Sequence, residues 1–108
     1  MTKHKFGAKQ CKSGEIKFPS KLERDYYNRL KALQRSGEIL FFLRQVPFHL
    51  PGNIKYVVDF VEFWAPVNEQ PGDIIFTEVK GYMTDLAQMK IRQTEEIYGI
   101  EINVVKKI

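Results

Sequence analysis

The sequence predicts an α/β domain in which helices pack on a mixed β-sheet. Two segments place apolar residues at helical spacing, and four others are rich in β-branched and aromatic residues. Their order along the chain is helix, three strands, helix, strand (α-β-β-β-α-β). The 108 residues are 44% hydrophobic and show no internal repeat or linker, so we expect one domain over residues 1–108.

The first predicted element is a basic N-terminal arm. Residues 1–18 hold five lysines against one glutamate, and their surplus of +4 equals the net charge of the chain; the lysines are Lys3, Lys5, Lys9, Lys12 and Lys17. Such an arm is typical of segments that contact nucleic-acid phosphates, because each neutralised phosphate releases counterions. The alternative is a solvated tail, and charge alone favours neither.

A short strand is expected over residues 15–18, followed by the first helix. Ser20 is its expected N-cap, and Ser36-Gly37 ends it. The apolar residues of this helix recur at helical spacing, at Leu22, Tyr26, Leu30 and Leu33.

The first long strand begins at residues 39–43, which are apolar on both alternating faces. This pattern predicts a strand that is covered on both sides or lies at a subunit contact. Further strands are expected over residues 55–64 and 73–80, with turns at Pro51-Gly52 and Pro71-Gly72.

The C-terminal part predicts a helix and a last strand. Thr84 caps the helix, which runs to Tyr98 and stops at Gly99, and the strand covers residues 102–105.

Two carboxylates interrupt the apolar pattern of the strands. Because side chains alternate along a strand, Asp59 shares its face with Val57 and Val61. Glu78 and Lys80 share a face of the following strand, whereas Thr77 and Val79 point the other way. An acid on a strand face with apolar neighbours is costly unless a partner compensates it.

A hairpin folded about Asn68 and Glu69 would place Asp59 directly opposite Glu78. Like charges in that position repel, and a divalent cation would relieve the repulsion, since carboxylate oxygens are ligands that Mg²⁺ and Mn²⁺ prefer. The alternative is a buried salt bridge between Lys80 and one of the acids, with the other acid exposed.

These residues resemble the PD-(D/E)xK nuclease superfamily. The first half of the motif matches Tyr56-Val57-Val58-Asp59-Phe60, with Val58 in place of the usual proline, and the second half matches Phe76-Thr77-Glu78-Val79-Lys80-Gly81. The helix that begins Ser20-Lys21-Leu22-Glu23 is similar to the glutamate-bearing helix of that superfamily, and Arg44-Gln45-Val46-Pro47-Phe48 to its glutamine-containing segment. Small phage-type endonucleases and Holliday junction resolvases are the most similar branch, followed by transposon end-cleaving endonucleases.

The resemblance implies a restriction-endonuclease-like core and a DNA endonuclease that hydrolyses phosphodiester bonds with Mg²⁺, or with Mn²⁺ as a substitute. The implied catalytic residues are Glu23, Asp59, Glu78 and Lys80, and Gln45 supports the active site. The implied metal ligands are Asp59, Glu78, the Val79 carbonyl and Glu23. Branched DNA is the implied substrate, and a homodimer the implied assembly.

Several residues have a second interpretation. Ser20 and Glu23 also form a capping box, in which Glu23 would only cap the helix. Lys90 and Arg92 are predicted to contact DNA, but ion pairs with Glu95 and Glu96 on a solvated helix face explain them equally well.

The rival functions are a transposon- or restriction-type endonuclease of the same superfamily and a DNA-binding module without activity. A protein of the cytoplasm is expected, or of the host cytoplasm if a phage encodes it. Cys11 is the only cysteine, so no internal disulfide can form, and we find neither a signal peptide nor a membrane-spanning run. No membrane partner and no small-molecule cofactor are expected.

Overall fold

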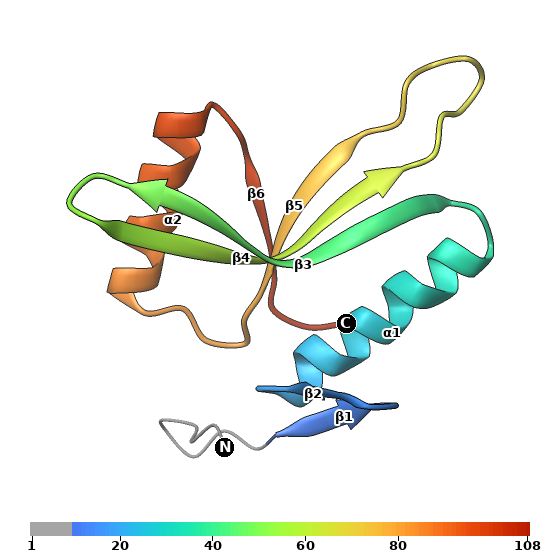
Figure 1. Cartoon of the computed structure of the whole chain (residues 1–108), viewed down its shortest axis with the longest axis horizontal. Coiled ribbons are helices and arrows are strands. Elements are labelled where there is room, and N and C mark those ends of the chain that lie inside the picture. Colours follow the sequence, from blue (N-terminus) through green and yellow to red (C-terminus); the bar gives the residue numbers. More distant parts are fainter. Residues whose placement is uncertain (1–9) are drawn as a thin grey trace.

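Four strands form a mixed, strongly twisted sheet in the computed structural model, which describes residues 10–108 (Figure 1). The sheet order is β3 (Ile39–Leu50), β4 (Ile54–Trp64), β5 (Ile74–Val79) and β6 (Ile102–Val105). Neighbouring strands from β3 to β5 are antiparallel, and β5 and β6 are parallel, joined through α2 (Asp85–Tyr98). With α1 (Lys21–Arg35) before β3, the predicted α/β class and the order α-β-β-β-α-β are confirmed.

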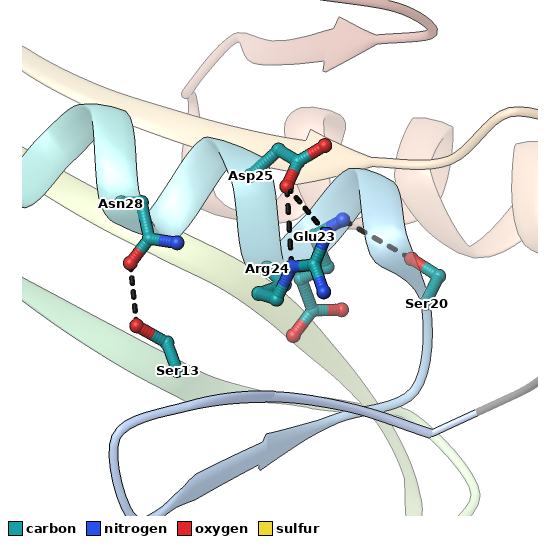
Figure 2. A network of polar contacts seen from close by, with 6 residues as sticks. All are labelled: Ser13, Ser20, Glu23, Arg24, Asp25 and Asn28. Atoms are coloured by element: carbon teal, nitrogen blue, oxygen red, sulfur yellow. Dashed lines mark hydrogen bonds and ion pairs between the residues drawn. The ribbon is translucent and has the colours of Figure 1, made fainter.

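The second half of the expected basic arm is a folded hairpin. Strands β1 (Cys11–Ser13) and β2 (Ile16–Phe18) pair in an antiparallel sheet of their own and contact α1. Phe18 is fully buried, and the Ser13 hydroxyl donates a hydrogen bond to Asn28 of α1 (Figure 2). Strand β2 matches the predicted strand, whereas β1, with one apolar residue in three, was not predicted.

Helix α1 begins and ends where the sequence predicts. The Ser20 hydroxyl accepts a hydrogen bond from the Glu23 amide, and Gly37 follows the last turn with a φ of 85°. Its buried residues Tyr26 and Leu30 pack against a core cluster formed by Ile39, Phe60 and Val79. The helix is therefore fixed to the strands that carry Asp59 and Glu78.

Strand β3 is longer than predicted, because it continues through Pro47 to Leu50. A proline is tolerated there since β3 is an edge strand, where a missing N–H leaves no partner unpaired. The described residues do not cover its start on both sides: Leu40, Phe41 and Leu43 are about half exposed.

The connection between β4 and β5 reverses at Asn68 and Glu69, and not at Pro71-Gly72 as predicted. Asn68 and Glu69 have positive φ angles of 49° and 66°, and the residues on either side of them form two backbone hydrogen bonds with each other. This is the two-residue turn whose twist suits a hairpin. Gly72 instead lies against the Trp64 carbonyl, at a place where a side chain would not fit.

Helix α2 lies over the other end of the sheet (Figure 1). Thr84 caps it and Gly99 ends it in the left-handed conformation, as predicted. Its Ile91 packs in a second core cluster with residues such as Tyr56 and Val58. Within residues 10–108, no helix has both the length and the apolar character needed to cross a bilayer.

Candidate active site

Three buried carboxylates converge from different elements of the fold. Glu23 of α1, Asp59 of β4 and Glu78 of β5 are 3%, 9% and 3% exposed. The pairing of β4 with β5 runs from Phe63 opposite Ile74 to Phe60 opposite Thr77, so its continuation places Asp59 opposite Glu78. The predicted register of this hairpin is confirmed.

Gln45 connects two of these acids. Its amide Nε2 donates to Asp59 Oδ1 at 3.2 Å and lies 3.4 Å from Glu23 Oε2. The left-handed backbone of Gln45, with a φ of 53°, interrupts β3 at this position. Gln45 itself is exposed, so the buried acids Asp59 and Glu23 lie directly beneath a surface residue.

The second oxygen of Asp59 is bound by the main chain of β5. Asp59 Oδ2 accepts a hydrogen bond from the Val79 amide at 2.8 Å. In a strand, the N–H and C=O of one residue point to the same side, so the Val79 carbonyl is also directed towards β4. The Asp59 carboxylate and the Val79 carbonyl, which are expected to hold a metal together with Glu78, therefore lie on the same side of β5.

The carboxylate of Glu23 does not serve the helix cap. Only its backbone amide contacts Ser20, while the carboxylate points away from Ser20 (Figure 2). Glu23 Oε2 instead lies near Gln45 and 3.7 Å from Arg44 Nη2. Of the two interpretations of Glu23, the geometry favours a side chain that belongs to the acidic cluster.

Burial and mutual repulsion raise the pKa values of two of the acids. Burial, followed by the Asp59 charge, raises the pKa of Glu23 from 4.5 to about 7. The same causes raise the pKa of Glu78 from 4.5 to about 8, although Tyr56 and then the charge of Lys80 lower it in part. Perturbed carboxylates in one cluster are a frequent property of catalytic sites.

The environment of Glu78 leaves a ligand position open. Its buried Oε1 forms no hydrogen bond of good geometry, although the buried Tyr56 hydroxyl lies near enough to lower the pKa of Glu78 in part. A native protein rarely buries an unsatisfied carboxylate oxygen without a functional reason. A bound cation would satisfy this oxygen.

The donor set fits Mg²⁺ or Mn²⁺ held by few protein ligands. Within residues 10–108, no three histidine, cysteine or acidic side chains are placed to enclose a metal by themselves. Mg²⁺ is usually bound by one or two carboxylates, with water and substrate phosphate completing its shell. Asp59, Glu78 and the Val79 carbonyl provide such a set, and Glu23 lies beside it.

A cavity of about 350 Å³ adjoins Glu78. Its wall contains three lysines, Lys55 from β4, Lys80 directly after β5 and Lys90 from α2. Lys80 was predicted as a catalytic residue and Lys90 as a DNA contact, whereas Lys55 was not singled out. The cavity therefore combines a buried acid with positive charge, an arrangement suited to an anionic substrate bound through a metal.

The other predicted DNA-contacting residues lie outside this cavity. Lys12 and Lys17 are exposed and directly opposite each other in the β1–β2 hairpin, and Arg92 lines a separate hollow on α2. In the part of the chain that the structure describes, Lys90 and Arg92 make no ion pair, and Glu95 accepts a hydrogen bond from the Ile102 amide. Lys3, Lys5 and Lys9 lie outside the described residues.

A buried network beneath the site was missed by the sequence analysis. Glu62 is 1% exposed and accepts hydrogen bonds from the Tyr26 hydroxyl at 2.6 Å, the Thr77 hydroxyl at 2.7 Å and Trp64 Nε1 at 3.0 Å. This acid joins α1 to β5, which carry Glu23 and Glu78. The available signal was that Glu62 shares its strand face with Phe60 and Trp64, since a charge on an apolar face is the same anomaly that singled out Asp59.

Comparison with known proteins places the chain in a family. It belongs to the family described as protein of unknown function (DUF1064), whose sequence model matches residues 3–106. No curated protein and no solved structure gave a significant match. The family relationship thus extends over nearly the whole chain, and the function has to be argued from the site.

Proposed function

We propose that this protein is a divalent-metal-dependent DNA endonuclease. Its active site, which hydrolyses phosphodiester bonds, is formed around Asp59 and Glu78. One observation carries the proposal: Glu78 is a buried acid with an unpartnered oxygen, opposite a second acid and beside a cavity with three lysines. A structural salt bridge would pair the acid with a cation, but Glu78 has no ion pair among the described residues.

The charges favour a phosphate substrate. Three acids in one cluster would repel an anion, and a divalent cation bound between them would reverse the local field. The lysines of the cavity would then contact the flanking phosphates of the nucleic acid, which carry most of the binding free energy.

Each residue has a distinct task in this proposal. Asp59, Glu78 and the Val79 carbonyl would hold the metal, which would act as a Lewis acid and lower the pKa of a bound water. Glu23, with a pKa near 7, suits the transfer of a proton from the attacking water at neutral pH. Lys80, exposed beside the cavity, would stabilise the negative charge that develops on the phosphate oxygens.

Gln45 would be a positioning residue. Its amide fixes Asp59 and lies next to Glu23, so it orients two acids without reaching the reacting atoms itself. A carboxylate held by such a hydrogen bond keeps the geometry that a metal with strict octahedral preference requires.

The proposed substrate is branched DNA, on the resemblance to Holliday junction resolvases. Paired cuts on a junction need two active sites related by a two-fold axis, so the proposal includes a homodimer. A transposon- or restriction-type enzyme would prefer a sequence over a branch point, and a binding module would not respond to metal.

Cleavage of a labelled four-way junction and of a linear duplex with the same sequence, each in Mg²⁺ and in EDTA, tests the proposal. We expect cutting in Mg²⁺ only, and faster cutting of the junction. Equal rates on both substrates would reject the resolvase assignment and keep the endonuclease. Binding without metal-dependent cutting of either substrate would reject the enzyme.

A further inference from the structure

We propose that Arg44 is a phosphate-binding residue of the site, acting beside Glu23 and apart from the lysines of the cavity. The inference rests on the proposed function, because the phosphate it assigns to Arg44 is one of the DNA backbone. Three observations on the side chain of Arg44 support it.

The guanidinium group of Arg44 is held by aromatic rings. Its Cζ lies 4.4 Å from the centroid of the Phe18 ring and 5.6 Å from that of Tyr27. Stacking fixes the plane of a guanidinium while leaving its N–H groups at the edge available. Phe18 is fully buried and packs on Tyr27 at 5.0 Å, so this platform is rigid.

Arg44 has no adequate acceptor within the described residues. Its Nε is buried without a hydrogen-bond partner, and its one ion pair among the described residues, to Glu23 Oε2, is long at 3.7 Å, although Arg44 still lowers the pKa of Glu23 in part. A guanidinium carries five N–H donors, and buried donors are ordinarily satisfied. At least one buried donor of Arg44 is therefore left without an acceptor among the described residues.

Arg44 is also placed where a phosphate can reach it. Its side chain remains 27% exposed, and the next residue, Gln45, is exposed and contacts Asp59. The planar guanidinium matches phosphate oxygens with two parallel hydrogen bonds, which an ammonium group cannot do. Arg44 thus contacts Glu23, whereas Lys55, Lys80 and Lys90 line the cavity beside Glu78.

The alternative is that Arg44 only balances the charge of Glu23. The two roles predict different results in a Glu23→Gln variant. If Arg44 only neutralises Glu23, substitution of Arg44 should no longer affect DNA binding once the charge of Glu23 is removed. The two roles also differ in their response to salt, because each phosphate contact adds about 0.9 to the slope of log K against log salt concentration.

The test is metal-free binding of a fluorescent four-way junction and of a linear duplex, measured in EDTA over a range of salt concentrations. The variants are Arg44→Met, which keeps the stem on Phe18, and Arg44→Lys, which keeps the charge. Arg35→Met, at the exposed end of α1, is the matched control. Circular dichroism and thermal melting establish that each variant is folded.

We expect Arg44→Met to weaken binding roughly 10-fold and to lower the salt slope by about one, both alone and with Glu23→Gln. Arg44→Lys should keep the slope and lose part of the affinity, and Arg35→Met should resemble the wild type. If Arg44→Met does not fold, the retained slope and reduced affinity of Arg44→Lys decide the matter.

Unchanged affinity and slope in Arg44→Met, or an effect that disappears with Glu23→Gln, would overturn the assignment while leaving the endonuclease proposal intact. A wild-type protein that binds neither DNA, in EDTA or with a divalent cation present, would overturn both proposals.

Discussion

Asp59 Oδ2 accepts a hydrogen bond from the Val79 amide at 2.8 Å, which ties the acid of β4 to the residue that follows Glu78 in β5. The bond extends the pairing of the two strands beyond Phe60 and Thr77 through a side chain. Asp59 and Glu78 are therefore placed by the sheet itself, and the predictions below concern the residues that surround them.

Substitutions at Ser20 and Glu23 distinguish the helix cap from the active site. Ser20→Ala removes the cap and should lower the free energy of unfolding by about 1 kcal/mol with unchanged cleavage. Glu23→Gln keeps the cap amide and should slow cleavage by roughly 10²-fold, the scale of a lost general base. Urea unfolding and cleavage rates measure the two effects, and slow cleavage in Ser20→Ala with normal cleavage in Glu23→Gln would reverse the assignment.

The buried Glu62 is predicted to be a stabilising residue. Glu62→Ala removes the acceptor of three hydrogen bonds and leaves the buried hydroxyls of Tyr26 and Thr77 unsatisfied. We expect the free energy of unfolding to fall by about 3 kcal/mol or more in denaturant titrations. Glu101→Ala, at an exposed acid, is the control and should change it by less than about 0.5 kcal/mol. A loss as small as that of the control would show that the network contributes little.

The raised pKa values predict how stability depends on pH in the absence of metal. The pKa of Glu23 is about 7 and that of Glu78 about 8 in the folded protein, against 4.5 as the ordinary value. The folded state therefore binds more protons than the unfolded state between pH 4.5 and 8. Stability should be greatest below that window, fall as the pH rises through it, and level off above it.

Calorimetry in EDTA across this window measures the decrease in melting temperature. Glu78→Gln should remove the part of the decrease that lies near pH 8. Mg²⁺ should raise the melting temperature more at high pH than at low pH, because metal and protons compete for the same carboxylates. A melting temperature that rises through the window in EDTA would contradict the burial of these acids.

Gly72 is predicted to be intolerant of any side chain. A Cβ built on Gly72 would lie 1.7 Å from the Trp64 carbonyl oxygen, which is main chain and cannot turn aside. Gly72→Ala should cost about 2 kcal/mol or more in unfolding free energy. Gly81→Ala is the matched control, since its Cβ would meet nothing within 4 Å. Equal stability of the two variants would contradict the close contact of β4 with the chain before β5.

The fold was largely predictable because its signals are local. Helical spacing and caps at Ser20 and Thr84 marked both helices, and the alternation in β4 and β5 gave the correct faces and register. The β1–β2 hairpin and the second half of β3 were missed, since β1 has few apolar residues and Pro47 argues against a strand unless the strand lies at an edge.

The site was predictable where a single residue broke a pattern and not where distant residues meet. Asp59 and Glu78 stood out as charges on apolar faces. The contacts of Arg44 with Phe18 and Glu23, and of Glu62 with Tyr26, join segments separated along the chain. Nothing in the local sequence marks such pairs, because only packing of α1 on the sheet creates them.

The measurement closest to the central claim is single-turnover cleavage of a labelled four-way junction in Mg²⁺ by the wild type, Glu78→Ala and Glu96→Ala. Glu96 is an exposed acid of α2 and serves as the matched control. We predict that the wild type and Glu96→Ala cut the junction. A folded Glu78→Ala that still binds DNA should cut it on the order of 10²- to 10³-fold more slowly, as expected for the loss of an electrostatic catalytic group. Cutting by Glu78→Ala at the wild-type rate would contradict the account.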